Sequence, residues 1–219
     1  TAYYEHNAAV VLETIAAAKR TSAYPFAVVK PSAIGSFELY HKKTAGHKLS
    51  TSEQLIWTAM QQRFELLANA AAQAAVVLMI DAEESWIQDG VDMLVLPLLR
   101  KYNSDKLVVA LTIQLYLKDR NVLYKSLLKD ADEKGYVLGV KLVRGAYMEK
   151  ERSRAAALKI SSPVCDTKDQ TDSQYKDALQ HALKNLNSHF CIVATHNQSD
   201  INWVVDYCSQ ANISLGNAN

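Results

Sequence analysis

The chain has 219 residues, of which 49% are hydrophobic and 21% are charged, so it can bury a core of domain size. Its formal net charge of +1 and the lack of a basic patch with interleaved aromatic residues exclude a typical nucleic-acid-binding protein. No apolar run reaches the ~18 residues of a membrane helix, and the three cysteines lack C-x-x-C spacing, so we expect free thiols.

Predicted helices and strands alternate along the chain. The first element is an amphipathic helix over residues 5–20. Five apolar runs predict strands at residues 26–29, 76–80, 107–116, 137–143 and 190–193. Helices are predicted at residues 51–73, 86–102, 119–134, 149–186 and 199–210, the fourth of them broken at residues 161–163. Residues 36–48 are polar and carry no predicted element.

This alternation predicts βα units and a parallel sheet. The spacing of the closest strands fits a (β/α)8 barrel, and no Gly-rich first turn of the dinucleotide-binding type is present. We therefore predict an α/β fold of the TIM-barrel type. Residues 1–219 are expected to form one partial barrel domain, with a helix and connection at 1–25 and five βα units at 26–219.

Polar residues follow every predicted strand at its C-terminal end. They are Lys30, then Asp81, Glu83 and Glu84, then Gln114 and Tyr116, then Arg144 and Tyr147, then Thr195, His196 and Asn197. Each alone has an ordinary structural explanation, such as a helix cap or a hydrogen-bonded histidine. Parallel strands place these ends on one rim, however, so their coincidence favours a shared pocket. Lys30, Lys141 and Arg144 predict a cationic rim, which suits a carboxylate, a pyrophosphate or a reduced flavin.

Two other site types fit the sequence poorly. The six histidines are scattered and show no H-x-x-x-H spacing, so we predict no metal site. No serine or cysteine lies in a G-x-S-x-G elbow, so a nucleophilic hydrolase is also disfavoured. A barrel hydrolase that uses Asp81 and Glu84 as acid and base stays open as a weaker alternative.

Six motifs closely resemble those of proline dehydrogenase, the flavin-dependent enzyme of proline catabolism, in its single-function branch. They cover nearly the whole chain in the order of that family: VVKPSAIG (28–35), LMIDAEESW (78–86), IQLYLKDR (113–120), GVKLVRGAYMEKERSRA (139–155), DQTDSQY (169–175) and VATHN (193–197). The fourth motif together with IDAEES is the most specific of the set.

The resemblance implies a distorted (β/α)8 barrel that holds FAD non-covalently at the strand ends. It implies that L-proline gives a hydride to flavin N5 to yield pyrroline-5-carboxylate, and that a quinone then takes the electrons. Lys30, Asp81 and Tyr147 match the proline site, where Lys30 meets the carboxylate and orients with Asp81, and Tyr147 walls the ring. The positions that match the flavin side are Gln114, Lys141, Val143, Gly145 and Ala146; those around the rest of FAD are Thr171, Thr195, His196 and Asn197.

The chain also departs from the family pattern. Leu111 stands where many relatives have Asn, and the mapping places only about five of the eight strands in this chain. The expected missing parts are a first strand, two further strands after the fifth, and a final helix whose paired arginines grip the proline carboxylate. A non-catalytic pseudoenzyme of the same fold and hydroxyproline as substrate therefore stay open. We expect a mitochondrial location for a eukaryotic protein, and a cytoplasmic or peripheral membrane location for a bacterial one.

Overall fold

Five parallel strands form one sheet in the computed structural model, which describes residues 2–21, 26–186 and 188–213. The strands pair in chain order: β1 (Phe26–Val29), β2 (Val77–Ile80), β3 (Val109–Gln114), β4 (Leu138–Val143) and β5 (His189–Ala194). The predicted strands and their parallel arrangement are confirmed. Among the described strands, β1 and β5 are the two edges, so the sheet is open in this chain.

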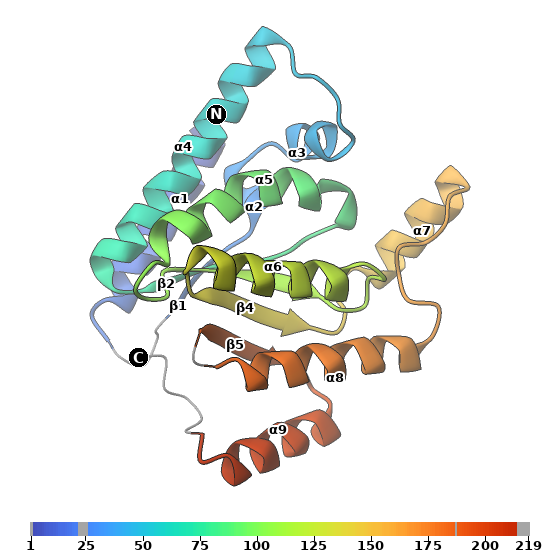
Figure 1. The fold of residues 1–219 in the computed structure, drawn as a ribbon. Helices are drawn as coiled ribbons and strands as arrows, with labels where there is room; N and C mark the ends of the chain where they lie inside the picture. Colours follow the sequence, from blue (N-terminus) through green and yellow to red (C-terminus); the bar gives the residue numbers. More distant parts are fainter. Residues whose placement is uncertain (1, 22–25, 187, 214–219) are drawn as a thin grey trace.

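Most of the helices pack on the outer face of the sheet, while α7 projects away from it (Figure 1). Their bounds are α1 (Ala2–Ala18), α2 (Pro31–Ile34), α3 (Phe37–Thr44), α4 (Thr51–Ala74), α5 (Ser85–Tyr102), α6 (Arg120–Lys134), α7 (Met148–Leu158), α8 (Lys168–Lys184) and α9 (Gln198–Gln210). The main core lies between these helices and the outward-facing strand residues, such as Leu78, Leu111 and Leu142. The predicted break in the fourth helical region is confirmed, since α7 and α8 are separate helices.

The sheet is strongly curved, as a barrel wall is. Phe26 on β1 and Phe190 on β5 lie on opposite edges of the sheet, yet their ring centroids are only 6.0 Å apart. A small inner cluster of Val77, Met79 and Ala110 packs against Phe26. Side chains alternate between the two faces of a strand, so this inner face continues at each strand's C-terminal end into the polar residues of the rim.

The polar segment at 36–48 contains a helix that the sequence pattern did not predict. Ser36 caps α3 by accepting a hydrogen bond from the backbone N–H of Leu39. Only Leu39 and Tyr40 of this helix are buried, so its apolar stripe is too short to detect by periodicity. It packs closely on α5, where a Cβ on Gly90 would come within 2.4 Å of the Tyr40 carbonyl oxygen.

A charged cluster joins α5 to the start of α6. The Arg120 guanidinium lies 3.5 Å from Asp89, 3.7 Å from Asp92 and 3.2 Å from Asp119. Asp92 also accepts a hydrogen bond of 2.8 Å from the side-chain amide of Gln88. Burial raises the pKa of Asp92 to about 6, against the opposing effects of Gln88 and Arg120.

Asp92→Asn is expected to stabilise the protein at pH 7 and to have little effect at pH 4. The folded pKa of Asp92 lies above its value in the unfolded chain, so its contribution to stability is present at pH 4 and is lost as the pH rises through about 6. An amide carries no such dependence, and we expect a gain of about 1–2 kcal/mol at pH 7. Urea unfolding at pH 4 and at pH 7 measures this gain. Asp89→Asn is the control, because the Asp89 side chain is exposed. A gain that is equal at both pH values would contradict the assignment.

Candidate functional site

Three predicted strand tips meet in one row on the inner face of the sheet. Register places Thr112 opposite Lys141, and Asp81 follows β2 at the same level. The Lys141 ammonium forms an ion pair with Asp81 Oδ1, and the Thr112 hydroxyl donates to the Ile80 carbonyl at 3.1 Å and lies 3.4 Å from Asp81 Oδ1. Both charged side chains are 22% exposed, so the pair can be reached from solvent.

This pairing corrects one expectation. Asp81 was expected to orient with Lys30, but the structure pairs it with Lys141. Lys30 lies at the end of β1 with an exposed side chain, close to the Tyr147 hydroxyl. Burial raises the pKa of Tyr147 above its usual value, and the Lys30 ammonium opposes that rise.

Gln114 and Tyr116 form a buried pair closer to the C-terminal end of the sheet than this row. Gln114 is the last residue of β3, and Tyr116 lies two residues further along the chain. The Gln114 amide nitrogen donates to the Glu83 carbonyl at 2.7 Å and to the Tyr116 hydroxyl at 3.2 Å. The same hydroxyl accepts from the backbone N–H of Tyr147 at 3.2 Å. Gln114 Oε1 is buried and has no hydrogen-bond partner among the residues that the structure describes. A buried acceptor of this kind is costly unless a ligand donates to it.

The turn after β4 leaves backbone open to a ligand. Gly145 and Ala146 are exposed, while Val143 is half-buried at the strand end opposite Gln114. A Cβ on Gly145 would meet Met148 Sδ at 3.0 Å, which is a tight contact. The small residues therefore let the chain turn directly into α7, and Tyr147, the residue just before this helix, shares the Tyr116 hydroxyl with Gln114.

The remaining carboxylates of the rim serve the scaffold. Glu83 accepts hydrogen bonds from the Ser32 backbone N–H at 2.8 Å and from its hydroxyl at 2.7 Å, which fixes the turn that carries Lys30. Glu151 makes the same pair of bonds to Ser85 at the start of α5, at 2.6 and 2.7 Å. Glu84 is buried and is paired with Lys150 at 2.8 Å, which leaves it poorly placed for acid–base work beside Asp81.

Arg144 does not belong to the inner face, which corrects the expected cationic rim. It follows Val143, so it points to the outer side, where its guanidinium forms ion pairs with Asp172 of α8 and Asp200 of α9. It also lies 5.1 Å from the centroid of the Tyr175 ring. Arg144 is therefore a structural link between β4 and two helices.

The residues predicted to hold the rest of the cofactor lie beside β5 and α8. Thr171 is buried on α8, and Thr195 receives a hydrogen bond of 3.1 Å from the Asn197 backbone N–H. Asn197 caps α9 through bonds to the backbone N–H groups of Ser199 and Asp200. The His196 side chain is exposed at this end of β5.

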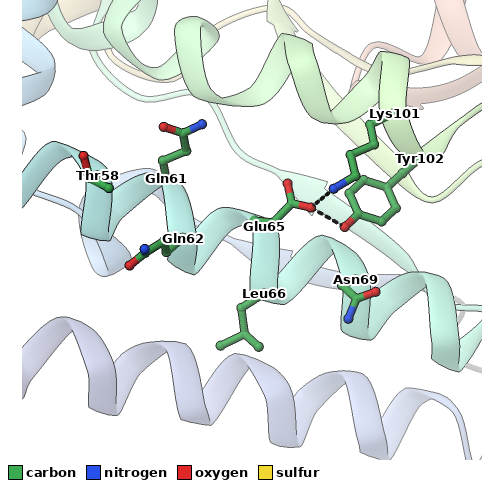
Figure 2. A pocket seen from close by; sticks show the side chains of 8 residues that line it. All are labelled: Thr58, Gln61, Gln62, Glu65, Leu66, Asn69, Lys101 and Tyr102. Atoms are coloured by element: carbon green, nitrogen blue, oxygen red, sulfur yellow. Dashed lines mark hydrogen bonds and ion pairs between the residues drawn. The ribbon is translucent and has the colours of Figure 1, made fainter.

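A separate surface groove lies away from these strand tips, between α4 and the last turn of α5 (Figure 2). Glu65 of α4 crosses its floor to an ion pair with Lys101 and accepts a hydrogen bond of 2.6 Å from the Tyr102 hydroxyl. Its lining contains none of the predicted site residues.

Sequence reasoning missed two contributors to the site. Thr112 was given no role, and Tyr116 was noted only as a polar residue of the rim. The signal was present in the alternation of Thr112, Gln114 and Tyr116, which places all three on one face of β3 and its extension.

Comparisons with known proteins agree with this geometry. The family model described as proline dehydrogenase matches residues 2–217. A protein of Pectobacterium carotovorum subsp. carotovorum, named carbapenem antibiotics biosynthesis protein CarD, is 33% identical over 190 residues, which cover 87% of this chain and 50% of that protein. Human mitochondrial proline dehydrogenase 1 is 34% identical over 164 residues, which cover 72% of this chain and 27% of the human protein. The chain thus spans half or less of the length of these relatives.

Two crystal structures of proline utilization A show the same fold. The protein from Bdellovibrio bacteriovorus, inactivated by N-propargylglycine, has a TM-score of 0.81 and 18% identity, over 97% of this chain and 23% of that chain. A mutant of the Bradyrhizobium japonicum protein has a TM-score of 0.81 and 20% identity, over 99% of this chain and 22% of that chain. The predicted fold of the TIM-barrel type is confirmed, with a sheet that is not closed in this chain.

Proposed function

The chain belongs to the proline dehydrogenase family, and from this premise we propose that the protein oxidises L-proline to pyrroline-5-carboxylate with FAD as its cofactor. The observation that carries the proposal is the row of Asp81, Thr112 and Lys141 beneath Gln114, with Tyr147 beside it, on one rim. When bound, FAD supplies the hydride acceptor for the carbon next to the proline nitrogen.

The residues of this rim fit a flavin. The orphaned Gln114 Oε1 is a fixed acceptor for a ring N–H, and the Gly145 and Ala146 backbone is open to close approach. A lysine at position 141 supplies positive charge, which stabilises a reduced ring that carries negative charge. Val143, Thr171, Thr195, His196 and Asn197 stay candidates for the remaining cofactor contacts.

Three residues are proposed to hold the substrate. The exposed Lys30 ammonium near the Tyr147 hydroxyl is suited to bind the proline carboxylate, because it is open to solvent and can form a charge-assisted hydrogen bond with an anion. The Tyr147 ring, with the Lys150 ammonium 5.5 Å from its centroid, would form the wall beside the pyrrolidine ring. Asp81 holds the Lys141 ammonium in place through their ion pair.

The electron acceptor and the location follow from the same premise. We propose a quinone as acceptor, with peripheral association at a membrane. The described helices include none that is long and apolar enough to span one. Relatives from animals and plants are named mitochondrial proline dehydrogenases. We propose the mitochondrion for a eukaryotic protein, and the cytoplasm or the membrane surface for a bacterial one.

The full-length protein, purified with FAD supplied, is expected to show flavin absorbance and to reduce a redox dye only when L-proline is present. Hydroxyproline in place of proline tests the substrate, and dye reduction by a soluble quinone tests the acceptor. Flavin binding without turnover would instead support a non-catalytic protein of this fold. If neither flavin absorbance nor proline-dependent reduction appears, the proposal is wrong.

A further inference from the structure

Tyr116 is fully buried beyond the end of β3, and its hydroxyl lies between two residues that the proposed function uses. On one side it accepts a hydrogen bond from Gln114 Nε2, and on the other from the Tyr147 backbone N–H, both at 3.2 Å. A phenolic oxygen has two lone pairs, so these two bonds use its whole accepting capacity. The hydroxyl thus joins the proposed flavin side of the rim to the proposed substrate side.

The orientation of the Gln114 amide is fixed by this arrangement. The Glu83 carbonyl oxygen can only accept, so the amide nitrogen must be the end that faces it, at 2.7 Å. The second N–H of the same nitrogen goes to Tyr116, which leaves only Oε1 to face a ligand. Without the Tyr116 hydroxyl, one amide hydrogen would lose its acceptor, and the amide would be held less firmly, by the Glu83 carbonyl alone.

The same hydroxyl also sets the start of α7. Tyr147 is the residue before the first turn of this helix, and its side chain makes no capping hydrogen bond. Its backbone N–H is tied to Tyr116, whose ring lies 4.0 Å from a Cβ placed on Gly145. The position of the Tyr147 ring therefore depends on the same buried phenol.

We propose that Tyr116 is a positioning residue, which holds the Gln114 amide with its oxygen toward the flavin and sets the Tyr147 backbone at the substrate wall. This inference rests on the proposed function. Tyr116 itself contacts neither substrate nor flavin in this proposal. Its effect on the flavin is exerted through Gln114.

Tyr116→Phe keeps the buried ring and removes only the hydroxyl. FAD affinity of the full-length apo protein, measured by titration with FAD, is expected to fall about threefold to tenfold, the range for one lost hydrogen bond. The absorbance spectrum of the bound flavin should shift, because the hydrogen bond to its ring is no longer fixed. The KM for proline should also rise, because the Tyr147 ring at the proposed substrate wall is held less firmly.

Tyr124→Phe is the matched control. Tyr124 is also fully buried, yet its hydroxyl has no hydrogen-bond partner among the described residues. Its removal should leave FAD affinity, spectrum and KM unchanged. If Tyr116→Phe behaves like Tyr124→Phe in a wild-type protein that binds FAD and oxidises proline, the inference is wrong while the proposed function stands. A wild type without flavin or turnover defeats the proposed function itself.

A double-mutant cycle tests whether Tyr116 acts through its partner. On a Gln114→Ala background, Tyr116→Phe should cause no further loss of FAD affinity. An equal loss on both backgrounds would overturn the assignment. Should Tyr116→Phe fail to fold by circular dichroism, Gln114→Glu provides the test. It places an acceptor oxygen against the Glu83 carbonyl, so FAD binding as tight as that of the wild type would contradict the fixed amide orientation.

Discussion

Lys141→Met is expected to lower proline-dependent dye reduction about 100-fold to 1,000-fold, the range for loss of one preorganised electrostatic group. It removes the cation of the row and leaves the Asp81 carboxylate with the Thr112 hydroxyl as its one remaining side-chain neighbour within hydrogen-bond distance in the described part of the chain. An unpaired negative charge would then lie where we propose that the ring gains electron density. The measurement is kcat/KM for proline in the FAD-loaded full-length protein.

Two further variants separate the effect of the Lys141 charge on activity from its effect on stability. Lys141→Arg keeps a cation within reach of Asp81 and should recover most of the activity. Lys141→Met combined with Asp81→Asn removes the unpaired carboxylate, so stability should return toward the wild type while activity stays low. Lys129→Met is the control, because Lys129 is 75% exposed and, among the residues that the structure describes, forms an ion pair only with Glu133 one turn away. Full activity in Lys141→Met would remove the basis for the proposed role of this row.

The strands and their order were within reach of sequence reasoning, because alternating apolar runs and helical stretches specify βα units with little ambiguity. The rim was also predictable, since every strand of a parallel sheet ends on the same side. The sequence does not specify the register in which neighbouring strands pair. The level at which Thr112 pairs with Lys141 decides that Asp81 meets Lys141 instead of Lys30.

Arg144 shows a different kind of error, one that alternation alone could have prevented. Val143 was predicted to face the flavin, and neighbouring residues in a strand point to opposite faces, so Arg144 had to point outward. Helix α3 is a harder case, because two buried residues in eight give no detectable period. The assigned roles of Lys30, Tyr147 and the residues after β5 stay predictions.

Arg144→Met is expected to lower the free energy of unfolding by about 2 kcal/mol, less than for a fully buried ion pair, because Arg144, Asp172 and Asp200 are only partly buried. The Arg144 side chain is 16% exposed and forms ion pairs with Asp172 and Asp200. Its loss leaves two carboxylates from α8 and α9 without their shared cation beside the Tyr175 ring. Urea unfolding followed by circular dichroism gives the change.

The contribution of the shared cation can be separated from that of one surface charge. Lys168 also pairs with Asp172 but is 75% exposed, so Lys168→Met should change stability by no more than about 0.5 kcal/mol. Adding Asp200→Asn to Arg144→Met removes one of the unpaired carboxylates and should recover about 1 kcal/mol. If Arg144→Met unfolds at the same urea midpoint as the wild type, apolar packing alone holds α8 and α9 in place, with Val204 and Cys208 as the buried residues of α9.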